Sequence, residues 1–175
     1  SMEWGPGTAG TDTNLYRSAA DTLKTDDNFT VGGAFNGASN INTGAWTTYV
    51  PTWGSSGTAP VLNDGTISGR YCQDGKMITV VIKLTAGAGT TFGTGNYNFS
   101  LPFAASSSGD YLGQGRLVGT AQWASHTLTA ASASIIQPFF PATATDTRIT
   151  NWTPTVPETF ASTKTMRVQA TYEIA

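Results

Sequence analysis

Side chains with catalytic or metal-binding chemistry are scarce in this chain. It holds one cysteine and one histidine, Cys72 and His126, together with 11 acidic residues. A zinc site needs three or four converging ligands, and a nucleophilic triad needs a base beside a serine or cysteine. Ser125 precedes His126, but neighbouring residues of a strand point to opposite faces of a sheet. The sequence therefore predicts no metal site, no cofactor and no catalytic residue.

The acidic residues do not resemble a hydrolytic pair either. A glycosidase needs two facing carboxylates, one of them with a raised pKa. Most acids here stand in turn-like stretches, where aspartate is favoured for its turn geometry: Asp26, Asp27, Asp64, Asp74 and Asp110. The glycine-rich stretch 87–95 lacks the lysine and the following helix of a phosphate-binding loop. We therefore expect a protein that is not an enzyme, with a polysaccharide depolymerase as the least favoured alternative.

Aromatic residues beside short polar ones are the remaining chemical resource. Tryptophan and tyrosine rings stack on the apolar faces of sugars, while Asn and Asp bind hydroxyls. Tyr111 follows Asp110 and Trp152 follows Asn151, each pair in an expected loop. These four residues are the predicted ligand-binding residues. The alternative for both rings is that they cover the core.

Other aromatic residues have structural interpretations. Trp46, Tyr49 and Trp53 are expected in the core or at an interface, and Trp123 in the core. The pair 139–140, bracketed by prolines, either anchors a loop or contacts a neighbouring chain.

Composition narrows the class of protein further. Only 11% of the residues are charged, whereas 39% are hydrophobic, so disorder driven by charge does not fit. The net charge of −2 and the dispersed basic residues argue against nucleic acid, which binds through clustered lysine and arginine. No stretch approaches the ~18 consecutive apolar residues of a membrane span, so membrane insertion is not expected.

The chain must position its residues on short strands. Residues 45–84 are expected to form a hairpin across Asp74-Gly75, a dipeptide that favours positive φ. The returning strand alternates apolar residues at even positions 78–84, and the closing strand does the same at 166–174. About seven to nine short strands with Gly and Pro punctuation predict an all-β fold, an antiparallel sandwich or jelly roll.

The segments after residue 85 have expectations of their own. Residues 97–101 are a strand that ends at Pro102, and two strand candidates at 111–125 and 126–140 divide near Ser125. Residues 141–164 are expected to be long connecting structure. Ligand contact is expected from loops at 86–96, 104–115 and 137–163.

We expect three parts in the chain. We expect residues 1–13 to be a flexible leader or a remnant of a cleavage site. Residues 14–44 are expected to form a stalk, and residues 45–175 the β-structured tip. The stalk segment has too few large apolar side chains to bury a core alone, which predicts a trimer whose chains bury them mutually. Either short extended pieces or a helix over Tyr16–Leu23 suits its sequence.

The stalk carries a resemblance to a known class. NLYRSAADTLKTDDNFTVGGAFNG, residues 14–37, resembles the stalk of phage and prophage tail fibres and minor tail proteins, particularly of actinobacterial phages. The stretch after it, to about residue 103, resembles the tip module of such proteins. The resemblance implies a homotrimeric, receptor-binding tip on the virion, attached to other tail proteins through its stalk. Its partner would be a bacterial cell-surface glycan at the host surface. The alternative is a structural module that caps the fibre without a receptor site.

Overall fold

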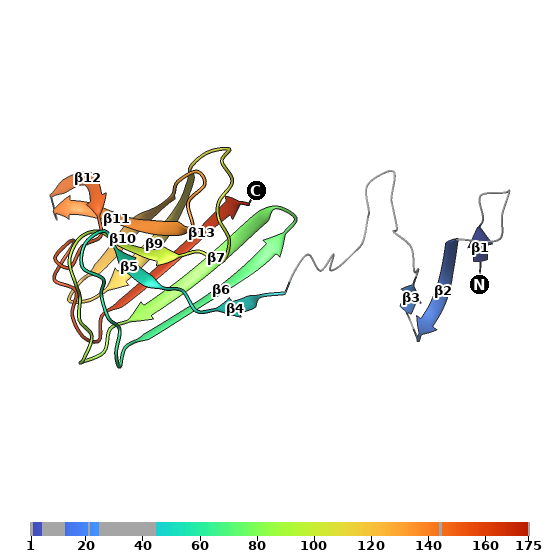
Figure 1. Cartoon of the computed structure of the whole chain (residues 1–175), viewed down its shortest axis with the longest axis horizontal. Helices are drawn as coiled ribbons and strands as arrows, with labels where there is room; N and C mark the ends of the chain where they lie inside the picture. Colours follow the sequence, from blue (N-terminus) through green and yellow to red (C-terminus); the bar gives the residue numbers. More distant parts are fainter. Residues whose placement is uncertain (1, 5–12, 21, 25–44, 144, 175) are drawn as a thin grey trace. The chain divides into compact units, whose positions relative to one another are not determined.

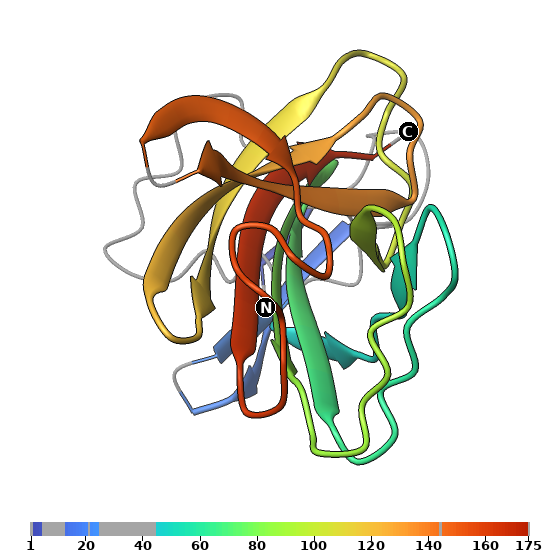
Figure 2. The same cartoon turned by 90° about the vertical axis from the view of Figure 1, so that its left-hand side faces the viewer.

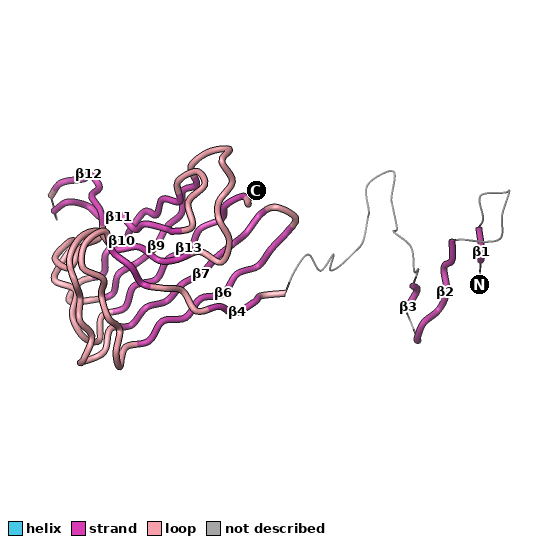
Figure 3. Tube along the Cα trace, in the orientation of Figure 1, coloured by secondary structure: helices cyan, strands magenta, loops and turns pink. Residues whose placement is uncertain are grey.

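A computed structural model describes residues 2–4, 13–20, 22–24, 45–143 and 145–174. Strands and loops make up all of these residues (Figure 3), and the described chain has no helix that could cross a membrane. The chain divides into two compact units, Ser1–Ile41 and Asn42–Ala175.

The first unit contains a small antiparallel sheet. Its strands are β1 (Met2–Trp4), β2 (Thr13–Ala19) and β3 (Thr22–Lys24), in the order β1-β2-β3. The extended alternative for the segment from residue 16 is therefore the observed one, and not the helix. A strand also lies within the stretch expected as a leader. Residues 25–44 of the expected stalk lie outside the described residues, and the trimer stays a prediction.

The second unit is built on one antiparallel sheet. Its strands are β4 (Thr47–Tyr49), β5 (Trp53–Ser55), β6 (Thr66–Asp74), β7 (Met77–Thr85), β8 (Tyr97–Ser100), β9 (Tyr111–Val118), β10 (Gln122–Thr129), β11 (Ile135–Thr143), β12 (Asp146–Asn151) and β13 (Thr165–Glu173). They follow the order β4-β6-β7-β13-β9-β10-β11-β8-β5, and β12 pairs with β11 beside this path. The predicted all-β, antiparallel character is confirmed.

The sheet curls into a half-barrel (Figures 1 and 2). Its two end strands, β4 and β5, are consecutive in the chain and are separated only by residues 50–52. Thr52 binds β8 in both directions: its N–H donates to the Ser100 hydroxyl at 2.8 Å, and its carbonyl accepts from the Ser100 N–H at 2.9 Å. The short link therefore joins one end of the sheet to the other.

The central hairpin is confirmed, but its turn is shifted by one residue. Asp74 pairs with Met77, so the two central residues are Gly75 and Lys76 and not Asp74-Gly75. Gly75 has a φ of 57°, and Lys76 is not among the residues with positive φ. A turn with positive φ at both centres was expected. Glycine at the first centre alone is the pattern of a type II′ turn, which sets this register.

The inward face of the sheet carries the predicted apolar alternation. The even residues of β7 and β13 are all buried: Ile78, Val80, Ile82, Leu84, Met166, Val168, Ala170 and Tyr172. β7 pairs with β13 along its full length, so these side chains form one continuous layer. Both strand predictions are confirmed, except that Ile174, expected on the same buried face, follows β13 and is half-buried.

Aromatic rings fill the space inside the curl. Trp152 is 0% exposed and lies 6.1 Å from Trp53, ring centroid to ring centroid, in a stacked arrangement. Tyr97 and Phe160 contact both tryptophans through tilted or edge-on rings. The core is therefore one cluster enclosed by the curled sheet.

Two segment predictions were wrong. The stretch 111–140 was expected to hold two strands divided near Ser125, but it holds β9, β10 and the start of β11, and Ser125 lies inside β10. The chain turns at 119–121 instead, where the Gly119 N–H donates to the Ala121 carbonyl at 2.9 Å. The stretch 141–164 was expected to be connecting structure, but it contains the end of β11 and all of β12. Prolines inside β11 hid this strand, because proline is uncommon within sheets.

Candidate functional site on the outward face of the sheet

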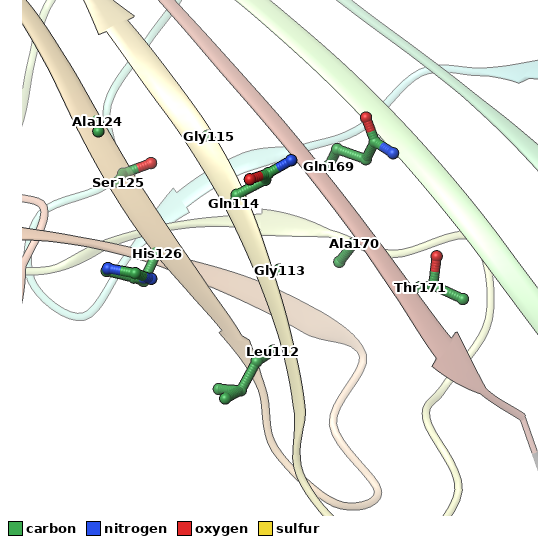
Figure 4. Close-up of a pocket in the computed structure, with 10 residues that line it drawn as sticks. All are labelled: Leu112, Gly113, Gln114, Gly115, Ala124, Ser125, His126, Gln169, Ala170 and Thr171. Carbon is green, nitrogen blue, oxygen red and sulfur yellow. The ribbon is translucent and has the colours of Figure 1, made fainter.

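The outward face of β9, β10 and β13 is hollowed. A shallow hollow of about 480 Å³ is lined by residues of these three strands (Figure 4): Leu112, Gly113, Gln114, Gly115, Ala124, Ser125, His126, Gln169, Ala170 and Thr171. The side chains that point outward belong to alternate positions, because successive residues of a strand face opposite sides. Ser125 is accordingly buried while His126 is exposed, as their adjacency on a strand predicted.

Two amides and the histidine form a line across this hollow. Gln169 pairs with Gln114, and Gln114 pairs with His126 on the next strand. We call these three residues the amide row. All three are exposed, and within the described residues neither glutamine side chain takes part in a hydrogen bond. The row therefore offers free donors and acceptors to a polar ligand.

Beside the amide row lies a line of basic residues. Arg167 of β13 pairs with Lys83 of β7 on one side and with Arg116 of β9 on the other. We call these three exposed residues the cation row. Arg116 Nη1 donates to Gln122 Oε1 at 3.2 Å. Since adjacent strands are about 4.8 Å apart, the row concentrates positive charge in a short span.

Two smaller hollows adjoin the cation row. One, of about 290 Å³, is lined by Arg116 and Arg167, and the other, of about 300 Å³, by Arg70 and Lys83. Val81 belongs to both, so the two hollows are neighbours on one surface. The outward face is thus indented from β4 to β10 and bordered by four basic side chains.

A tryptophan orients one of these basic residues. The Arg70 guanidinium carbon lies 4.6 Å from the centroid of the Trp46 ring, which is a cation–π contact. Trp46 is 46% exposed, so it is not a core residue, and its place at an interface stays a prediction. The ring and the guanidinium lie together at the β4 end of the face.

The best-connected acid stabilises loops away from this face. Glu158 accepts hydrogen bonds from Lys164 Nζ at 2.6 Å, from Trp123 Nε1 at 3.0 Å and from the Thr120 N–H at 2.9 Å, with a further bond from the Ala121 N–H. Burial raises the pKa of the Glu158 carboxyl, but these donors outweigh it and hold the pKa at about 2. The ionised Glu158 carboxylate therefore connects the β9–β10 turn to the loop before β13. It is not a proton donor at neutral pH.

Among the described residues, no group of three His, Cys, Asp or Glu side chains could hold a metal ion.

Burial raises the pKa of the Tyr172 hydroxyl to about 12, and it raises the pKa of Tyr49 and of Tyr97 as well. The Tyr172 hydroxyl donates to the Phe103 carbonyl at 3.0 Å and the Tyr49 hydroxyl to the Ser100 carbonyl at 3.3 Å. These phenols are neutral structural groups.

The first predicted ligand-binding pair lies at the start of β9. Asp110 Oδ1 accepts a hydrogen bond from the Ala131 N–H at 2.9 Å, so this carboxylate ties two loops together. Tyr111 is half-buried, and its ring lies edge-on to Tyr172 at 6.4 Å. Both interactions are structural. Ligand contact by this pair stays a prediction.

The second predicted pair ends β12. Asn151 is half-buried and pairs with Phe139. Trp152 is fully buried among the core aromatics, which matches the alternative that its ring covers the core. A ring in this position has no face open to a sugar. The structure therefore does not bring the two predicted pairs together into one exposed platform.

The remaining aromatic residues divide between the core and its rim. Trp53 and Phe140 are buried in the core, and Tyr49 and Trp123 pack partly buried against it. Phe139 and Phe140 lie in β11 and not in a loop.

The amide and cation rows are not visible in the sequence. Their members are separated by tens of residues and come together only through strand pairing. The available signal was alternation, which places Arg167, Gln169 and Thr171 on the face opposite the apolar one. Only the order of the strands shows that Arg116 and Lys83 flank Arg167.

Comparison with protein-family models, with curated proteins and with solved structures gave no match.

Proposed function

We propose that this chain is a non-enzymatic receptor-binding tip of a phage tail fibre, which attaches the virion to a bacterial cell-surface glycan. The resemblance of residues 14–37 to tail-fibre stalks supports the class of protein. The observation that carries the binding role is the amide row in its hollow of about 480 Å³. Within the part of the chain that the structure describes, these amides and the imidazole have no hydrogen-bond partner, so they suit the hydroxyls of a sugar.

The proposal includes a homotrimer formed through the stalk, which also connects the tip to other tail proteins. A shallow, open site binds weakly on its own, because a ligand there stays largely in contact with water. Three such sites on one fibre raise the overall affinity through effective concentration, so that each needs only millimolar to micromolar affinity. This arrangement suits a repetitive polymer on a cell surface.

The test is binding of the full chain to a glycan array and to host cells. Gln114→Ala combined with Gln169→Ala should remove most of the bound signal, because both amides line the hollow. Gln73→Ala is the matched control, since Gln73 is an exposed glutamine whose amide donates to the Gly75 carbonyl in the hairpin turn. Light scattering should give about three times the 18.3 kDa chain mass.

Two outcomes would count against the proposal. Unchanged binding by the double variant would remove the amide row from the site. No binding of the parent to any glycan or cell, with the trimer intact, would favour the structural module that caps a fibre. Release of reducing ends from host polysaccharide would instead indicate a depolymerase.

A further inference from the structure

The cation row places like charges directly opposite one another. Arg167 faces Lys83 on one neighbouring strand and Arg116 on the other, and like charges at paired positions destabilise a sheet. In the described part of the chain, the salt bridges join Arg148 to Asp146 and Lys164 to Glu158, so none involves this row. The row is thus unfavourable for folding and lacks an internal counter-charge.

The acidic side chains of the second unit do not neutralise the cation row. Asp64 binds the N–H groups of Ala88 and Gly89, and Asp110 binds that of Ala131. Asp74 and Glu173 both pair with Met77, at the far end of the hairpin. At about 3.4 Å per residue, Glu173 stands roughly 20 Å along β13 from Arg167. That distance exceeds the screening length of about 8 Å at physiological ionic strength, so Glu173 does not neutralise the row.

The basic side chains border indentations and not a flat surface. Arg116 and Arg167 line one hollow, Arg70 and Lys83 line the next, and the amide row lies alongside. Arg167 and Gln169 are alternate residues of β13, so the two rows are about 7 Å apart. A ligand that carries its negative charge close to its hydroxyl groups fits both rows at once.

We infer that the outward face of the sheet binds an acidic polysaccharide, with the cation row holding sugar carboxylates and the amide row holding hydroxyls of the same rings. The inference rests on the proposed function and specifies its ligand class. A uronic acid carries its carboxylate on the sugar ring, within reach of both rows. Arginine's planar fork matches a carboxylate with two parallel hydrogen bonds. A phosphodiester polymer carries its charge between the sugar or polyol units, which suits the adjoining rows less well.

The experiment measures binding of the full chain to immobilised polygalacturonate, with neutral dextran and poly(glycerol phosphate) as comparison polymers. Polygalacturonate should bind more tightly than either, and its affinity should fall as salt is raised. Arg116→Gln combined with Arg167→Gln should weaken binding by at least about tenfold, from the loss of charge-assisted hydrogen bonds. Lys83→Gln is a second, milder variant of the row. Every variant should melt at or above the parent's temperature, because loss of a like charge does not destabilise the sheet, so weaker binding would not come from unfolding.

Lys76→Gln is the matched control for Lys83→Gln, since each removes one positive charge. Lys76 lies in the turn between β6 and β7, so its replacement lowers the net charge without touching the row, and binding should change by less than about twofold. Equal weakening by Lys76→Gln would indicate unspecific attraction and overturn the inference. Tighter binding of poly(glycerol phosphate) would overturn it in favour of a phosphodiester ligand. Array binding to neutral glycans alone, dependent on Gln114 and Gln169, would also overturn it while leaving the proposed function standing.

Discussion

The two faces of β13 show how differently one strand is used. Its even residues are buried at 0–3% exposure, and its odd residues Arg167, Gln169 and Thr171 are exposed. Both sets lie on one backbone that pairs with β7 on one side and with β9 on the other, so strand pairing alone does not determine which set is buried. The inward face determines the stability of the half-barrel, whereas the outward face carries uncompensated polar and basic groups that contribute nothing to the core. Substitutions on the two faces should therefore have separable effects.

The largest expected effect comes from placing a charge on the inward face. Val168→Asp would bury an unpaired carboxylate at a residue that is 2% exposed, and we expect a loss of more than about 4 kcal/mol in the free energy of unfolding. Gln169→Asp, the next residue on the outward face, should change it by about 0.5 kcal/mol or less. Urea unfolding measures both, and similar losses would refute the assignment of the two faces.

Tryptophan offers the next comparison. Trp152→Ala would leave a cavity where four other rings pack, and we expect a loss of about 3–5 kcal/mol. Trp46→Ala on the outward face should cost about 1 kcal/mol or less, mainly from its contact with Arg70. Thermal or urea unfolding measures the stability of both variants. A small loss for Trp152→Ala would mean that its ring is not an essential part of the core.

Glu158 is a polar group that stabilises loops and belongs to neither row, and its replacement should have an intermediate effect. Glu158→Gln should cost about 1–3 kcal/mol at neutral pH, because it removes the charge that four donors share. The folded-state pKa of about 2 lies below the ordinary value of 4.5, so the unfolded state binds the proton more readily. The stabilisation is therefore complete above about pH 4.5 and is lost as the pH falls towards 2.

The corresponding measurement is urea unfolding of the parent and of Glu158→Gln across this pH range. The difference between them should shrink as the pH falls. A constant difference at all pH values would show that the carboxylate's charge is not what stabilises the loops.

The smallest effect should have the opposite sign. Arg167→Gln relieves like-charge repulsion with Lys83 and Arg116, so we expect an increase of about 0.2–1 kcal/mol in the free energy of unfolding at low salt. The increase should vanish near 1 M salt, where the screening length is about 3 Å. Arg148→Gln, which removes the salt bridge to Asp146, is the control and should give no increase. A destabilised Arg167→Gln would mean that the row has a structural role.

Periodicity was enough to predict the long inward faces. The apolar residues of β7 and β13 alternate without interruption, and each face is buried as expected. The strand β11 failed this test because Pro138 and Pro141 interrupt it. Trp152 was misleading for another reason: its neighbours in sequence are polar, but the chain around it folds inward, and the backbone N–H of Trp152 donates to the Pro138 carbonyl at 2.9 Å.

The outward rows could not be predicted from local sequence. Arg116, Lys83 and Arg167 become neighbours only through the order β7-β13-β9, and hydrophobic periodicity carries no information on which strands pair. A sequence reader can assign each residue to a face, but the neighbours across that face follow from topology. The sequence was thus enough to predict which types of residue the outward face carries, but not which of them lie side by side.

The link between β4 and β5 has a consequence for self-association. An open sheet normally presents two edges whose unpaired N–H and C=O groups can recruit a strand from another copy, which is a route to aggregation. Here the two strands that end the main path of the sheet have three residues each, Thr47–Tyr49 and Trp53–Ser55, and they flank a buried Pro51 that has no N–H to donate. An incoming strand would find only a short template at these two ends. Edge-to-edge association should therefore favour β12, the six-residue strand that pairs with β11 beside the main path.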